Sequence, residues 1–99
     1  MYFRLVPLKE ALFIHDIQLR LYGGTLGLLN EGILCSALER PNTGYYESLF
    51  EAASALMESL CNNHPFVDGN KRVAVMTTFY FLKLNGLETE QYNVNNEEM

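Results

Sequence analysis

The feature that most constrains this sequence is a stretch near its carboxyl end, residues 73–84, that is apolar on almost every side. A surface helix keeps a polar face toward water, so a helix without one is usually buried at the centre of its domain. Asn85-Gly86 follows and supplies a carboxyl-terminal stop. We therefore predict a buried central helix whose apolar residues are Val73, Val75, Met76, Phe79, Phe81 and Leu82.

Three more helices are predicted before this one. Residues 2–6 read as a short extended lead-in, and Gly23-Gly24 ends the first helix. Asn30 is the expected N-cap of a short second helix, which stops before a turn at residues 41–44. A third helix is predicted from about Glu47 to Cys61. The stripe along the first helix consists of Leu8, Leu12, His15, Leu19 and Tyr22. The apolar face of the third helix carries Phe50, Ala53, Met57 and Leu60.

Length and composition fit one all-α domain, a helical bundle around the central helix. The chain has 99 residues, of which 48% are hydrophobic, as in an ordinary folded globule. We place the domain at residues 1–87. Residues 88–99 are polar and acidic, and we expect them to be solvated and frayed.

Charge and cysteine usage exclude several classes of protein. The chain has seven basic and twelve acidic residues, and its net charge of −5 argues against direct nucleic-acid binding. Cys35 and Cys61 are far apart and read as small buried side chains of a reducing compartment. The sequence shows neither a signal peptide nor a membrane span, so we expect a cytoplasmic protein.

Residues 64–72, His-Pro-Phe-Val-Asp-Gly-Asn-Lys-Arg, combine the groups that phosphate chemistry needs. A helix amino terminus offers unpaired N–H groups and partial positive charge, and Gly69 allows a ligand close to the backbone. Lys71 and Arg72 in the first turn are unfavourable for the helix dipole, so a negative partner is expected. These features predict a phosphate site at the start of the central helix.

The same segment could supply a cation ligand and a base. Asp68 is its only carboxylate, and one carboxylate with phosphates and waters is a normal Mg²⁺ shell. Histidine changes charge near neutral pH, so His64 is the candidate base on a hydroxyl nucleophile. Pro65 favours an extended backbone at His64. Phe66 is predicted to pack the loop against the core.

A purely structural interpretation of these residues also exists. Asp68 could be an N-cap that forms an i,i+4 ion pair with Arg72, and His64 could be an ordinary histidine at a helix end. His15, on the apolar stripe of the first helix, is more simply a core residue than a ligand. Met57 and Met76 read as core residues too.

The nine-residue segment resembles the Fic-family signature in its death-on-curing (Doc) form, His-x-Phe-x-Asp/Asn-Gly/Ala-Asn-Lys-Arg. The flanks LFIHDIQLRLYGG, NEGILCSALERP and the helix ending in LNG are similar to the same group, so the resemblance covers about residues 5–87. It implies the Fic fold, an all-α bundle around the central helix. Members of this group continue past LNG into a further helix, and we expect that helix to be missing here, because TEQYNVNNEEM follows instead.

The resemblance assigns a role to each position. It implies that His64 is the general base, that Asp68 holds Mg²⁺ and that Gly69 and the Asn70 side chain bind an anion. Lys71 and Arg72 would contact the nucleotide phosphates, and Phe66 would be structural. Tyr45 and Tyr46 fall where Fic proteins place a flap that holds the target segment.

The resemblance also implies an activity. AMP-transferring Fic proteins have glycine where this chain has Lys71, whose stem and charge would obstruct that nucleotide pose. The Doc group resembles a protein kinase instead, transferring the γ-phosphate of ATP, with elongation factor Tu as target and a Phd-type antitoxin as inhibitor. AMP transfer and a catalytically silent antitoxin-binding module remain the alternatives. Apolar surface left by the missing helix would be covered by a homodimer or by the antitoxin.

Overall fold

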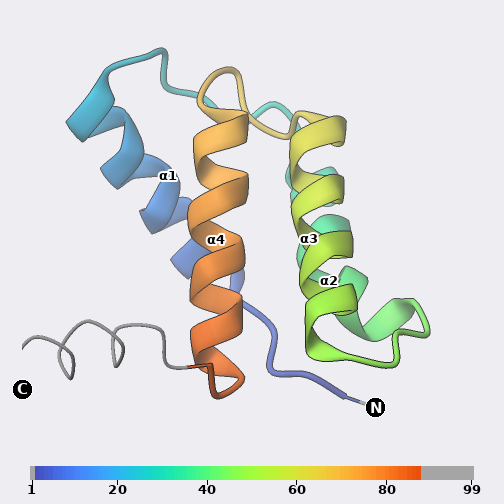
Figure 1. The fold of residues 1–99 in the computed structure, drawn as a ribbon. Helices are drawn as coiled ribbons and strands as arrows, with labels where there is room; N and C mark the ends of the chain where they lie inside the picture. Colours follow the sequence, from blue (N-terminus) through green and yellow to red (C-terminus); the bar gives the residue numbers. More distant parts are fainter. Residues whose placement is uncertain (1, 88–99) are drawn as a thin grey trace, which may run out of the picture.

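The computed structural model describes residues 2–87, which form four helices and no strand. In Figure 1, α4 lies between α1 and α3, and α2 packs behind α3. The predicted all-α bundle is therefore confirmed, while the acidic tail, residues 88–99, lies outside the described residues. No helix in residues 2–87 is long and apolar enough to cross a membrane. The helices are α1 (Leu8–Tyr22), α2 (Glu31–Thr43), α3 (Leu49–Asn63) and α4 (Asn70–Leu84).

Side-chain caps set where the middle helices begin. Asn30 Oδ1 accepts from the Ile33 amide at 2.9 Å, which confirms the predicted cap of α2. Ser48 Oγ accepts from the Glu51 amide at 3.1 Å, while Glu51 accepts from the Glu47 amide at 2.9 Å. The two bonds differ from a capping box in that the Glu51 side chain binds the amide before the N-cap rather than that of Ser48 itself. They start α3 at Leu49, two residues later than predicted.

The end of α2 differs from the prediction. Pro41 lies inside the helix, which continues to Thr43 and ends at Gly44. Pro41 is buried in the core, and its missing N–H affects only the last turn of the helix. The turn predicted at residues 41–44 is therefore wrong, because a proline near the end of a helix does not have to stop it.

The core includes the interface between α3 and α4, and the segment before α1 packs against it. Phe81 is fully buried, and the ring of Phe3 packs edge-on against it at 6.0 Å between centroids. Phe66, from the loop before α4, is only 1% exposed. The prediction that Phe66 packs the signature loop against the core is confirmed.

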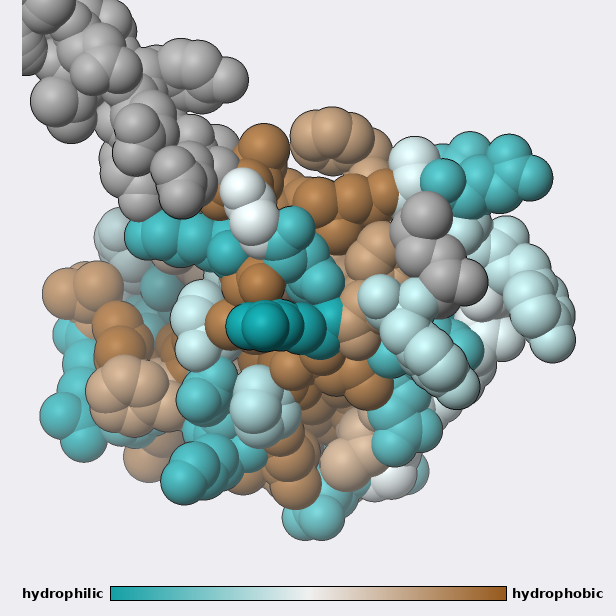
Figure 2. Space-filling view, turned by 90° about the horizontal axis from the view of Figure 1, so that it is seen from below, coloured by the Kyte–Doolittle hydropathy of each residue, from teal (hydrophilic) through white to brown (hydrophobic). Residues whose placement is uncertain are grey.

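One side of α4 is open, contrary to a helix buried all round. Val75 is 36%, Met76 41% and Phe79 55% exposed, and Phe50 of α3 is also exposed at 60%. Two apolar grooves flank Phe79, one toward α1 and one toward α3. Seen from the end away from the signature loop, hydrophobic side chains gather near the middle of the face with hydrophilic ones among them (Figure 2). The expected exposed apolar surface is present, whereas Met76 and Phe50 are not core residues.

Replacing Phe81 and Phe79 separately by alanine tests which side of α4 is buried. Phe81→Ala removes a fully buried ring and should lower the free energy of unfolding by about 3–5 kcal/mol. Phe79→Ala, on the same helix, should cost less than about 1 kcal/mol. Urea unfolding followed by circular dichroism measures both, and equal losses would contradict this orientation of α4.

Candidate active site

His64 lies at the carboxyl end of α3 in a conformation that was not predicted. It is the C-cap, with φ 48° and ψ 62°, and within residues 2–87 it is the one non-glycine residue at positive φ. The extended backbone predicted from Pro65 is therefore wrong, because the chain uses a left-handed residue to leave α3. This conformation turns the chain back toward α4 and leaves the imidazole exposed.

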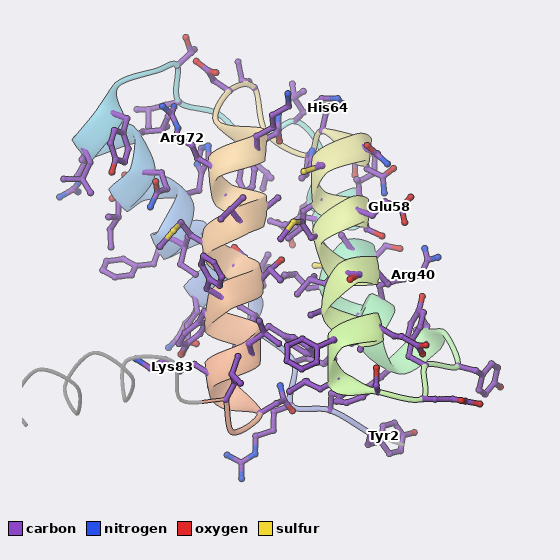
Figure 3. The ribbon with its side chains drawn as sticks, in the orientation of Figure 1. Tyr2, Arg40, Glu58, His64, Arg72 and Lys83 are labelled. Atoms are coloured by element: carbon purple, nitrogen blue, oxygen red, sulfur yellow. The ribbon has the colours of Figure 1, made fainter. Side chains whose placement is uncertain are left out.

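The amino end of α4 begins next to His64. Gly69 is its N-cap, at φ 79°, and it makes no side-chain cap, so the alternative in which Asp68 caps the helix is wrong. The first intrahelical bond runs from the Val73 amide to the Gly69 carbonyl at 2.9 Å. The amides of α4 that come before Val73 have no acceptor within the helix and are able to bind an anion. Figure 3 shows His64 and Arg72 at this same end of the bundle, on either side of α4.

Two backbone amides hold the carboxylate of Asp68. Its Oδ2 accepts from Thr25 at 3.1 Å and its Oδ1 accepts from Gly69 at 2.8 Å. The Thr25 amide, and after it the Gly69 amide, keeps the pKa of Asp68 below the ordinary carboxyl value. The exposed carboxylate is therefore charged and oriented at neutral pH. The Gly69 N–H already donates to Asp68, so an anion would have to bind the amides that follow it in α4.

The Asn70 side chain, predicted to bind an anion, instead bonds to the backbone of Phe66. Its Oδ1 accepts from the Phe66 amide at 3.0 Å and its Nδ2 donates to the Phe66 carbonyl at 2.9 Å. Asn70 thus satisfies both backbone groups of a residue whose side chain is buried. The side chain closes the loop, and only the Asn70 amide remains for an anion.

The two cations at the start of α4 differ in their surroundings. Arg72 donates to the Gly23 carbonyl at 3.2 Å, and its guanidinium lies over the Tyr22 ring, 5.4 Å from the centroid. Lys71 is exposed. Arg72 is therefore fixed by the end of α1 rather than by an ion pair with Asp68, while Lys71 is the cation that can follow a ligand.

The connection between α1 and α2 supports the whole loop, a role the sequence did not reveal. Val67 donates to Gly27 at 3.0 Å, and Leu29 donates to Pro65 at 2.7 Å. Leu28 and Phe66 form an isolated antiparallel bridge. The run of glycines before Asn30 was the available signal, because a Cβ on Gly24 or Gly27 would collide with the loop.

Tyr45 and Tyr46 do not reach this site. They lie between α2 and α3, and α3, about 22 Å long, separates them from His64 (Figure 1). Tyr45 is fully exposed, and Tyr46 accepts from Arg40 Nε at 2.9 Å, which raises the pKa of Arg40. The flap predicted at these residues is corrected: the described structure places them at the opposite end of the bundle.

The sequence that forms this loop and these helices matches a known family. The sequence model described as the Fic/DOC family matches residues 5–82. This chain belongs to the Fic/DOC family. The Fic/DOC signature is thus the segment that carries His64, Asp68 and the start of α4.

Two curated relatives are similar to this Fic/DOC chain. "Toxin Doc" of Mycolicibacterium smegmatis is 42% identical over 72 residues, 68% of this chain and 55% of the relative. "Protein kinase doc" of Escherichia phage P1 is 30% identical over 84 residues, 81% of this chain and 67% of the relative. The chain therefore spans between about half and two thirds of the length of these relatives. No solved structure matches significantly.

The residues present fit Mg²⁺ bound together with a polyphosphate. Within residues 2–87 no cluster of three or more His, Cys, Asp or Glu side chains could hold a metal alone. Mg²⁺ commonly takes one or two carboxylates and completes its shell with phosphate oxygens and water. Asp68 fits that requirement, because two amides orient its carboxylate beside the amino end of α4.

Gly24→Ala should disturb Asp68 more than Gly23→Ala does. Both glycines have positive φ, 130° and 81°, so alanine is strained at either. At Gly24 the new Cβ would also lie 2.9 Å from Asp68 Oδ2 and 2.8 Å from Leu19 Cδ2, whereas Gly23 has open space. Gly24→Ala should lose at least about 1 kcal/mol more unfolding free energy in urea than its neighbour. Equal losses would show that the close approach is unimportant.

Asp68→Asn should make the fold less sensitive to acid. Because the pKa of Asp68 is lowered by folding, its contribution to stability is present above the unfolded pKa, near 4. That contribution is lost as pH falls through the lower folded pKa. The unfolding free energy of the wild type should therefore drop more steeply below about pH 4 than that of Asp68→Asn. Parallel pH profiles in urea unfolding would contradict the assignment.

Proposed function

We propose that this Fic/DOC chain is a toxin that transfers the γ-phosphate of ATP, with Mg²⁺, to a hydroxyl group of a protein. One observation carries the proposal: an exposed histidine, an oriented carboxylate and the open amino end of α4 meet at one end of the bundle. The relative named "Protein kinase doc" supports this class of reaction.

The chain's own groups have separable roles in such a transfer. His64 accepts the proton of the incoming hydroxyl, whose oxygen forms a bond to the γ-phosphorus. The bond from that phosphorus to the bridging oxygen breaks, and ADP leaves. The first-turn amides of α4 and the Lys71 ammonium offset the charge on the phosphates. Mg²⁺, held by Asp68, would supply further positive charge at the phosphate oxygens.

Lys71 favours γ-phosphate transfer over AMP transfer. AMP-transferring members of the family have glycine at this position, which leaves room for the nucleotide's diphosphate. Lys71 is the second residue of α4 and is exposed, so its side chain would compete with the nucleotide for the space beside the proposed anion site. AMP transfer is therefore the second candidate, and a catalytically silent module the third.

Target and inhibitor follow from the family resemblance. Elongation factor Tu is the proposed acceptor, so that the unpaired toxin would arrest translation, and a Phd-type antitoxin is the proposed inhibitor. The relative named "Toxin Doc" supports a toxin–antitoxin role. The exposed apolar face of α4, with Met76 and Phe79, needs a covering partner, either an antitoxin or a second copy.

A two-label transfer assay tests the proposal. ATP labelled at the γ or at the α position is incubated with Mg²⁺, cell extract and purified chain. γ-Label should enter a protein, and His64→Ala should lower its rate at least about 100-fold, because the hydroxyl loses its base. Asp68→Asn keeps an acceptor oxygen for one of the two amides and loses the negative charge, so it should raise the Mg²⁺ concentration needed for transfer.

Other outcomes would identify the alternatives. Incorporation of α-label would replace phosphate transfer by AMP transfer. No incorporation from either position, together with growth arrest unchanged by His64→Ala, would favour the silent module. Tyr45→Ala is the control, because it changes a fully exposed ring at the far end of the bundle and should leave the rate unchanged.

A further inference from the structure

His15 of α1 is the one ionisable side chain in residues 2–87 that is buried, with 6% exposed. Its ring stacks on Phe66 with 3.8 Å between centroids and 9° between planes. Its Nε2 lies 3.0 Å from the carbonyl oxygen of Asp68. A buried imidazole on α1 thus contacts the signature loop at two residues that are 51 and 53 positions away in sequence.

The contact with Asp68 fixes the protonation of one ring nitrogen. A carbonyl oxygen only accepts hydrogen bonds, so Nε2 must carry a hydrogen and donate. The ring cannot rotate away without losing its stack on Phe66. His15 therefore presents a donor of fixed direction to the loop.

The carbonyl that His15 holds belongs to a rigid unit. The Asp68 carbonyl and the Gly69 N–H are two ends of one planar peptide group. At the other end, the Gly69 N–H donates to Asp68 Oδ1 at 2.8 Å. Gly69 lies at φ 79°, where glycine meets little steric restriction, and the Thr25 amide contacts only the carboxylate, so the bond from His15 is the contact that holds the carbonyl end of this plane. The direction of the Asp68 carboxylate is thus coupled to the His15 donor through one peptide plane.

We propose that His15 is a positioning residue: its Nε2–H holds the Asp68–Gly69 peptide plane and thereby directs the Asp68 carboxylate toward the bound cation. This inference rests on the proposed function, since it assigns the carboxylate to Mg²⁺. Packing alone would not need an imidazole here, because the neighbouring positions of this face of α1, Ala11 and Leu19, are apolar and buried.

Two substitutions separate the hydrogen bond from the stacking. His15→Gln places an amide nitrogen as many bonds from Cα as Nε2, so it keeps the donor and loses the ring. His15→Phe keeps a ring to stack on Phe66 and has no donor. His15→Asn, too short by one methylene, is the matched control for glutamine if phenylalanine does not fold.

The first readout is enzymatic. The Mg²⁺ concentration for half-maximal γ-phosphate transfer should rise about tenfold in His15→Phe and His15→Asn, and stay within about threefold in His15→Gln, since only glutamine keeps the hydrogen bond. A general loss of stability would lower the amount of active protein but would not move this concentration. An unchanged Mg²⁺ requirement in His15→Phe, or a raised one in His15→Gln alone, would overturn the proposal.

The second readout needs no nucleotide. Amide hydrogen exchange of Gly69, measured by NMR in the full chain, should be about fivefold or more faster in the two variants that lack the donor than in His15→Gln. Equal exchange in all variants would overturn the coupling through the peptide plane. If these rates separate as expected while the wild type transfers no γ-label, the positioning holds and the proposed function fails.

Discussion

The burial of Phe66 under α1 is the interaction on which the site depends. The loop between α3 and α4, which carries the histidine, the aspartate and a glycine of the signature, would be mobile if only its ends were fixed. Phe66 gives it an attachment in the middle, 1% exposed and stacked on His15. The Asn70 side chain bonds to both backbone groups of Phe66. The residues before and after Phe66 form backbone hydrogen bonds with the connection between α1 and α2. The loop is therefore fixed on three sides.

Most of the site's order comes from backbone groups rather than from side-chain pairs. Two amides orient Asp68, one carbonyl receives Arg72, and the free amides of α4 face the expected phosphates. The ion pair among residues 2–87, Arg20 with Asp16 at 3.0 Å, lies elsewhere on the surface of α1. A site of this kind needs few charged residues, because the helix terminus supplies local positive potential, so an acidic net charge does not argue against the proposed anion site.

Several features of α4, the helix that carries the candidate site, lower the stability of the fold. Lys71 and Arg72 oppose the helix dipole in its first turn. Further along, the buried hydroxyls of Thr77 and Thr78 have no hydrogen-bond partner within the described residues, at a cost of about 1–3 kcal/mol each. On its open side Met76 and Phe79 face solvent. The proposed polyphosphate at one end of α4 and the proposed partner on its open side would both stabilise this helix.

Sequence alone determined the helical bundle, the caps at Asn30 and Gly23, the central position of residues 73–84 and the segment that carries the chemistry. Those features depend on local spacing, on capping chemistry and on a motif of nine adjacent residues, all of which are visible in one dimension. Tertiary structure decided which side of α4 is open, the far position of Tyr45 and Tyr46, and the use of Asn70 to close the loop. It also brought His15, Gly24 and Thr25 to Asp68, because these contacts join residues more than forty positions apart. No local pattern records which segments will meet, since that is fixed only when the helices pack and the loop finds its place between them.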